Sequence, residues 1–167
     1  MPTTKKTDPC GGEAPLLFKK ILVGTDFSNY ADRAIEYAGM LAKTFDAKLF
    51  LLHVIESFTY SVTDTMTVIG HDKALSATAA ALLENLQSEL TDKGFSVDVF
   101  LAHGAPYKEI MEMAEKTGAD LIVIGTHGRT GMEHLLLGGV AEKVVRLAAC
   151  PVLTIPGTGP RDVFSGK

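Results

Sequence analysis

Short apolar runs alternate along the chain with segments in which apolar residues recur every three or four positions. The periodic segments predict amphipathic helices, and the apolar runs between them predict buried strands. The five predicted strands cover residues 21–24, 48–54, 95–102, 120–125 and 152–155. Strict alternation of strand and helix favours parallel pairing. The pattern therefore predicts an α/β fold, a doubly wound five-stranded parallel sheet with helices on both faces.

Residues with known capping preferences mark where the predicted helices begin and end. Ser28 can accept a hydrogen bond at the start of the first helix, and Pro106 suits the first position of the third. Gly94 follows the second helix, and Pro151 cannot continue the fourth. These residues place one helix in each connection between consecutive strands.

Three stretches fall outside this pattern. Residues 1–17 contain prolines and glycines without any period, and they predict a mobile leader. Residues 158–167 predict a loose tail. Residues 56–71 are polar, rich in threonine and without a clear period, so they predict an insertion between the second strand and the second helix. The remaining residues, 18–157, form one predicted domain.

Composition and charge exclude several classes of protein. A net charge of −4 argues against a generally basic surface for nucleic acid. No apolar stretch approaches the roughly 18 residues that span a bilayer, and no apolar segment follows the N-terminal lysines as in a signal peptide. We therefore expect a cytoplasmic protein that neither binds nucleic acid nor inserts into a membrane.

The segment after the fourth predicted strand carries the most distinctive glycine spacing. Gly125 and Gly128 bracket a tight turn, and Gly138 follows after nine intervening residues at the start of a predicted helix. Glycines let a backbone approach a ribose or a phosphate, and the free amides of a helix start attract anions. Doubly wound sheets bind ligands at the carboxyl ends of their strands. This segment and the Thr25-Asp26 loop after the first strand are therefore candidate ligand loops.

Each candidate side chain also has a simpler structural interpretation. Asp26 can serve as an acid at a helix start, and Arg129 as an exposed loop arginine. His127 and His134 have no further ligands near them in sequence, so no zinc site is indicated, and the identity of any metal is left open. His53, near the end of an apolar strand, is typical of a buried histidine with its polar atoms paired.

Catalytic motifs are missing from the sequence. It contains no P-loop, no dinucleotide fingerprint after the first strand, no nucleophile elbow and no C-x-x-C. Because spacing positions no general base, any ATP hydrolysis would be slow. A true hydrolase or nucleotidyl transferase on a related scaffold is therefore the least favoured interpretation.

Three motifs together resemble the universal stress protein family, in its ATP-binding branch. They are Ile21–Ser28, Leu51–Val54 and the run from Gly125 to Gly131 that continues through Gly138. The resemblance extends from about Lys20 to Pro156 and implies a Rossmann-like fold of the adenine nucleotide α-hydrolase-like type. It also implies homodimers that pair through the last strand, Val152–Ile155, whose apolar edge needs cover.

The resemblance implies roles for individual residues in nucleotide binding. Asp26 would contact the ribose, Val54 would line the adenine slot, and Ile124 with Gly125 would border the ribose. Phosphate contacts would come from Gly128, from the arm around His127 and Arg129, and from the turn at Gly138-Gly139-Val140. The whole predicted site comprises Thr25, Asp26, Val54, Ile124, Gly125, His127, Gly128, Arg129, Gly138, Gly139 and Val140.

One position departs from the family signature, which usually has Ser or Thr directly after the last glycine. Gly139 stands there and offers no hydroxyl to a phosphate or a metal. The departure leaves open whether ATP, ADP or AMP is bound, and whether magnesium accompanies it. The leading hypothesis is a stress-response sensor or regulatory module that binds an adenine nucleotide with little or no hydrolysis and acts on an unknown protein partner. The alternative is a dimeric interaction module that binds no nucleotide.

Overall fold

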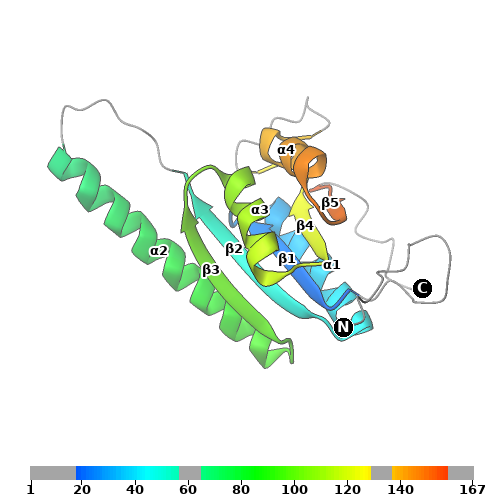
Figure 1. The fold of residues 1–167 in the computed structure, drawn as a ribbon. Coiled ribbons are helices and arrows are strands. Elements are labelled where there is room, and N and C mark those ends of the chain that lie inside the picture. The colour runs from blue at the N-terminus through cyan, green and yellow to red at the C-terminus, as the bar shows by residue number, and fades with distance from the viewer. Residues whose placement is uncertain (1–17, 57–64, 129–136, 158–167) are drawn as a thin grey trace, which may run out of the picture.

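Five parallel strands form one sheet in the computed structural model, which describes residues 18–56, 65–128 and 137–157 (Figure 1). The strands are β1 (Lys20–Thr25), β2 (Lys48–Ile55), β3 (Val97–His103), β4 (Leu121–Gly125) and β5 (Val152–Ile155). Their order across the sheet is β3-β2-β1-β4-β5, and every neighbouring pair is parallel. The predicted doubly wound fold is confirmed. The predicted leader, 1–17, and tail, 158–167, lie outside the described residues.

Four helices cover the two faces of the sheet: α1 (Asn29–Phe45), α2 (Thr65–Asp92), α3 (Pro106–Thr117) and α4 (Gly139–Leu147). Side chains alternate between the faces along each strand. One set packs under α1 and α2: Ile21, Val23, Leu49, Leu51, Leu121 and Val123. The other set packs under α3 and α4: Leu22, Phe50, Leu52, Ile122 and Ile124. Burial on both faces explains why the strands read as continuous apolar runs rather than as alternating ones.

Three of the four predicted helix-boundary residues occupy the predicted positions, whereas α4 ends at Leu147, before Pro151. Ser28 precedes α1, and its hydroxyl accepts a hydrogen bond from the backbone N–H of Ala31 at 3.3 Å. Pro106 is the first residue of α3. Gly94 follows α2 with a φ of +85°, a conformation that favours glycine. Local sequence therefore sets these helix ends.

The second helix begins earlier than the pattern predicted, and the prediction of an aperiodic insertion over 56–71 is wrong for its last part. The structure places Thr65–His71 in α2, whereas 57–64 lies outside the described residues. Side chains in the following turns, such as Ala74 and Leu75, are exposed, and the start of α2 extends away from the sheet (Figure 1). The exposed turns around Ala74 impose no apolar period on the sequence, so periodicity did not indicate that the helix extends further toward its amino-terminal end. Smaller differences are that β3 begins at Val97 and that α4 ends at Leu147.

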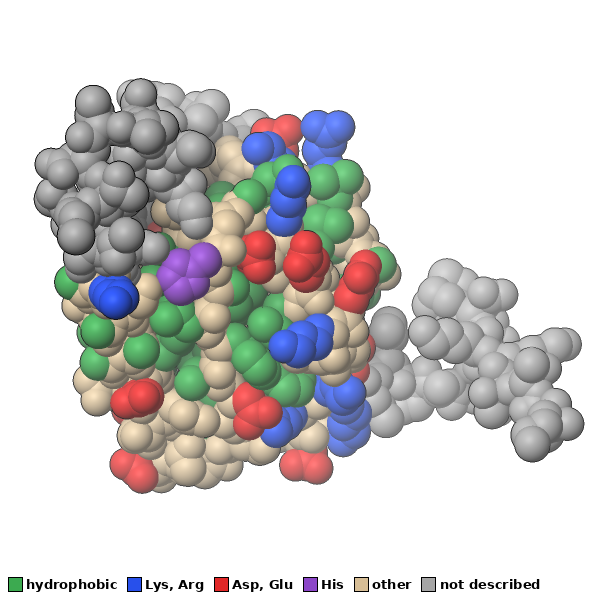
Figure 2. All heavy atoms as spheres, turned by 60° about the vertical axis from the view of Figure 1, so that its left-hand side comes forward, with side chains coloured by type: hydrophobic (Ala, Val, Ile, Leu, Met, Phe, Trp, Pro, Cys, Tyr) green, Lys and Arg blue, Asp and Glu red, His purple; other side chains and the backbone are tan. Residues whose placement is uncertain are grey.

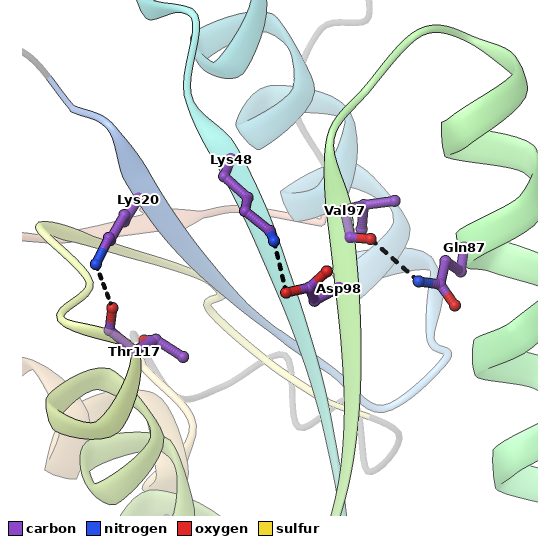
Figure 3. A network of polar contacts seen from close by, with 6 residues as sticks. All are labelled: Lys20, Lys48, Gln87, Val97, Asp98 and Thr117. Atoms are coloured by element: carbon purple, nitrogen blue, oxygen red, sulfur yellow. Dashed lines mark hydrogen bonds and ion pairs between the residues drawn. The ribbon is translucent and has the colours of Figure 1, made fainter.

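Two adjacent lysines at the start of the sheet cap helices on opposite faces. Lys20 Nζ donates to the carbonyl of Thr117 at the end of α3, at 2.9 Å (Figure 3). Lys19 Nζ donates to the carbonyl of Phe45 at the end of α1, at 2.7 Å. A positive charge is favourable at a helix carboxyl end, where carbonyls have no partner within the helix. These two contacts tie α1 and α3 to the amino-terminal end of the sheet. They involve no residue at its carboxyl end.

The edge strand β3 is held at the same end of the sheet. Asp98 forms an ion pair with Lys48 of β2 at 2.7 Å, and Gln87 of α2 donates to the carbonyl of Val97 at 3.1 Å (Figure 3). Unpaired edge carbonyls can recruit another chain, so this side-chain donor protects the edge.

Charge is mixed on the face that Figure 2 displays. Acidic and basic side chains are interspersed there among apolar ones, with no large area of one sign among the coloured atoms. Nucleic-acid surfaces are basic patches or stripes, and this face is not of that kind. None of the helices in the described ranges combines the length and hydrophobicity needed to cross a bilayer.

Candidate functional site

The two predicted ligand loops meet at the point where the strand order reverses. From β1 the chain adds β2 and β3 on one side, then returns to place β4 on the other side of β1. Val23 pairs with Val123, so Thr25 and Gly125 end neighbouring strands at the same level. Parallel sheets bind ligands at such a switch point because the loops diverge there and leave a crevice.

The turn after β1 holds Asp26 by local hydrogen bonds. The Thr25 hydroxyl accepts from the N–H of Phe27 at 3.1 Å, and Asp26 Oδ1 accepts from the N–H of Ser28 at 3.0 Å. Phe27 has a φ of +59°, a left-handed conformation that is costly for a bulky residue. Asp26 is half-buried. One carboxylate oxygen thus anchors the turn.

Gly128 comes from the other loop and lies against the second carboxylate oxygen of Asp26. A Cβ at Gly128 would lie 2.6 Å from Asp26 Oδ2, closer than any real side chain tolerates. The structure therefore brings together Asp26 and Gly128, which are far apart in the chain, and it leaves only glycine as a residue that fits without displacing the carboxylate.

Gly125 has a packing explanation that is independent of any ligand. A Cβ at this position would lie 3.0 Å from the Cβ of Tyr30 and 3.1 Å from the carbonyl oxygen of His127. The end of β4 thus approaches the first turn of α1 closely enough to require a residue without a side chain.

The start of α4 presents backbone amides beside the same loop. The N–H of Gly138 donates to the carbonyl of Thr126 at 2.7 Å, which draws the helix start to the end of β4. The first bond within the helix runs from Glu142 to Gly138, and Gly138 has no side chain with which to cap the first turn. The amides of Gly139 and Val140 precede that bond, so they have no acceptor within the helix and carry the positive end of its dipole.

The other predicted residues differ in their burial and in the groups they contact. His127 Nδ1 lies 3.0 Å from the Thr126 hydroxyl, and the His127 ring packs 5.6 Å from that of Tyr30. Val54 is half-buried near the end of β2, whereas Ile124 is buried in the core under α3 and α4. Arg129 lies outside the described residues.

Sequence reasoning missed Phe27 and Tyr30 as parts of this region. The ring of Phe27 packs on that of His53, with centroids 4.5 Å apart. The ring of Tyr30 occupies the space that a Cβ at Gly157 would need. Tyr30 lies outside the three motifs, and the motif Ile21–Ser28 indicated no role for Phe27, because each residue acts by packing against a residue distant in the chain. The prediction for His53 itself is confirmed: it is buried and hydrogen-bonded to the carbonyl of Thr25.

Negative charge gathers at the start of α1. The pKa of Asp32 is raised, first by desolvation and then by the negative charges of Glu36, Asp26 and Glu89. An anionic group would therefore be disfavoured on this side of the crevice and favoured at the start of α4. Within the described residues, no three His, Cys, Asp or Glu side chains lie close enough together to hold a metal ion.

Comparisons with known proteins agree on one family. The family model described as the universal stress protein family matches residues 17–156. The universal stress protein MJ0531 of Methanocaldococcus jannaschii is 35% identical over 142 residues, which cover 83% of this chain and 82% of that protein. MJ0577 of the same organism is 32% identical over 155 residues, covering 84% and 96% of the two chains.

Solved structures similar to this chain belong to the same family. A structure of MJ0577 superposes with a TM-score of 0.73 at 33% identity and covers 84% of this chain and 96% of that one. A universal stress protein in complex with cAMP superposes with a TM-score of 0.65 at 25% identity and covers 85% and 99% of the two chains.

Proposed function

Because the chain belongs to the universal stress protein family, we propose that it binds an adenine nucleotide where β1 and β4 end and acts in the cytoplasm as a stress-response sensor or regulatory module. The observation that carries the proposal is that Gly128 lies against Asp26 and that the start of α4 is bonded to Thr126 of the same loop, where β1 and β4 end. The similar protein solved with cAMP supports an adenine nucleotide as the ligand class.

The chemistry of the crevice matches the parts of a nucleotide. The carboxylate of Asp26 can accept hydrogen bonds from ribose hydroxyls, which are neutral donors. The amides of Gly139 and Val140 can bind phosphate oxygens at the positive end of α4. Gly128 lies against the carboxylate of Asp26, and the absence of a side chain there would allow the backbone to approach the ligand.

The remaining predicted residues would complete the nucleotide site. Val54, half-buried near the end of β2, would line the adenine slot, and the backbone of Thr25, Ile124 and Gly125 would border the ribose. His127, with Arg129 beyond it, would contribute to the phosphate side. If ATP is the nucleotide, magnesium would enter with its phosphates, as this ion commonly does.

Binding without rapid turnover is the expected behaviour. Among the described residues, Asp26 is the carboxylate placed between the two loops, and one of its oxygens already accepts from Ser28 while the other lies against Gly128. A general base must instead reach the proton of an attacking water. The arrangement therefore suits recognition of the ribose better than hydrolysis.

The direct test is to denature the freshly purified protein without added ligand and identify the released compounds by chromatography and mass spectrometry. Stoichiometric ATP, ADP or AMP would support the proposal and identify the nucleotide. An empty protein that also fails to bind ATP with magnesium in calorimetry would contradict it. That outcome would favour the dimeric interaction module, for which Gly139 in place of the signature hydroxyl is the supporting observation.

Gly139→Ser should shift the preference toward ATP. A Cβ at Gly139 would have no heavy atom within 4 Å, so a serine fits and restores the hydroxyl of the family signature. One added hydrogen bond contributes about 0.5–1.5 kcal/mol, so the ratio of ATP to AMP affinity should rise about 2- to 10-fold. Calorimetric titration with both nucleotides measures the ratio.

Gly139→Ala is the matched comparison, because it adds the Cβ without the hydroxyl. We expect the alanine variant to lack the gain in ATP preference. Equal ratios in the serine and alanine variants would show that the hydroxyl has no role at this position.

We further propose that the protein forms homodimers through β5. This strand ends the sheet, and Val152 and Leu153 are half-buried, each packed against a different core. Self-pairing along an edge strand covers its open hydrogen-bonding groups.

Val152→Arg and Leu153→Arg, made separately, should shift the mass in solution from dimer to monomer, because a buried guanidinium disrupts an apolar interface. Light scattering after size-exclusion chromatography measures the mass. Leu101→Arg, which changes a half-buried residue of the opposite edge strand β3, is the control and should leave the dimer intact. An unchanged mass in both β5 variants would reject this interface.

A further inference from the structure

The turn that carries Asp26 is held by a buried histidine from the neighbouring strand. We infer that His53 is a positioning residue for nucleotide binding, which acts by fixing the orientation of Asp26. The inference rests on the proposed function of the crevice, and it assigns His53 no contact with the ligand.

The first contact of His53 precedes Asp26 in the chain. His53 lies on β2 opposite Thr25 of β1, and its exposed fraction is 8%. Its Nδ1 lies 2.8 Å from the carbonyl oxygen of Thr25. Since a carbonyl can only accept, Nδ1 carries the proton and donates it. The backbone that enters the turn is thereby tied to β2.

The second contact follows Asp26 in the chain. The ring of Phe27 packs on the His53 ring, with centroids 4.5 Å apart and planes inclined by 37°. Phe27 needs such support, because its φ of +59° is unfavourable for a bulky side chain. One imidazole thus contacts the residues on both sides of Asp26.

Holding both neighbours restricts Asp26 before a ligand arrives. The carboxylate is anchored through Oδ1 to Ser28, and its other oxygen lies against Gly128, so a small rotation of the turn would move it out of place. Binding is stronger when the protein group does not have to be ordered during binding. Loss of the imidazole should therefore weaken nucleotide binding although His53 touches no ligand.

Histidine is well suited to this double contact. Phenylalanine would keep a ring against Phe27 but cannot donate to Thr25, and glutamine would keep a donor on a longer chain that has no ring. His53→Phe and His53→Gln thus each remove a defined part of the contact. His103, at the end of the adjacent strand β3, is bonded to Ser76 of α2 and provides the control His103→Asn.

The experiment measures AMP affinity by calorimetry in each variant, alone and combined with Asp26→Ala. We expect His53→Phe, which loses the donor to Thr25, to weaken AMP binding about tenfold, which corresponds to one hydrogen bond. His53→Gln, which loses the ring packed on Phe27, should also weaken AMP binding. His103→Asn should leave the affinity unchanged. In the Asp26→Ala background the loss caused by His53→Phe should vanish, because the double-mutant cycle isolates an effect that passes through Asp26.

If His53 had only a structural role, its substitution would lower the thermal unfolding midpoint, but its effect on AMP affinity would not depend on Asp26. If His53→Phe does not fold, His53→Gln carries the same cycle. Two outcomes would overturn this inference and leave the proposed function standing. In one, His53→Phe lowers the AMP affinity equally in the presence and absence of Asp26. In the other, a folded His53 variant binds AMP as tightly as the wild type. A wild type that binds no AMP, ADP or ATP would overturn the proposed function and this inference with it.

Discussion

Asp26→Ala is expected to weaken AMP binding about 10- to 100-fold, because hydrogen bonds to a charged acceptor contribute about 1.5–3 kcal/mol. Calorimetric titration measures the loss. The variant also removes the bond from the N–H of Ser28 to Oδ1, so the free energy of unfolding should fall by about 1 kcal/mol. Denaturant unfolding followed by circular dichroism measures that second effect.

Two further variants distinguish the contribution of the Asp26 charge from that of its hydrogen bonds and of other acidic residues nearby. Asp26→Asn keeps an oxygen for Ser28 and removes the charge, so its affinity should lie between those of the wild type and Asp26→Ala. Asp32→Asn removes an exposed carboxylate from the first turn of α1, on the side of the crevice where negative charge gathers, so it should not weaken the binding of anionic AMP. If Asp32→Asn weakened binding as much as Asp26→Ala, or if Asp26→Ala bound AMP normally, the ribose role of Asp26 would be rejected.

Gly128→Ala is expected to produce a loss of similar size through steric exclusion. The new Cβ would lie 2.6 Å from Asp26 Oδ2, so the carboxylate must turn away, and the added methyl group narrows the approach of the phosphates. The displaced atom is the end of a side chain, so the free energy of unfolding should change by less than about 1 kcal/mol. We therefore expect AMP affinity to fall about 10- to 100-fold, equivalent to about 1.4–2.8 kcal/mol.

Gly94→Ala is the matched control for this substitution. Gly94 has a φ of +85° and no heavy atom within 4 Å of a built Cβ, so alanine there strains the backbone without a clash. It should lower the stability and leave the AMP affinity unchanged. The steric account of Gly128 fails if Gly128→Ala binds AMP as tightly as the wild type. The steric account also fails if Gly94→Ala weakens AMP binding as much as Gly128→Ala does.

Several elements of the fold could be predicted because their causes are local. The apolar runs of β1 and β4, the cap at Ser28 and the proline at the start of α3 each act within a few residues of themselves. The start of α2 could not be predicted, because exposed turns such as those around Ala74 bury no face and so impose no period on the sequence.

The candidate site also has parts that could be predicted from the sequence and parts that could not. Glycine spacing and the Thr25-Asp26 loop predicted which segments would face the crevice. The packing role of Gly125 against Tyr30, and the face of the sheet on which Ile124 packs, were not visible in the sequence. Both depend on which helix covers which part of the sheet, and this is a property of the assembled layers.

The sequence by itself determined the alternation of strands and helices, the parallel sheet and the family motifs, because period, capping and loop chemistry act between near neighbours. Only the tertiary structure decided the order β3-β2-β1-β4-β5, the placement of Gly128 against Asp26, and the bond from His53 to Thr25. Each of these joins residues from different strands or loops. Such contacts form only when the sheet is assembled, because their energies depend on distances that the order of residues along the chain does not fix.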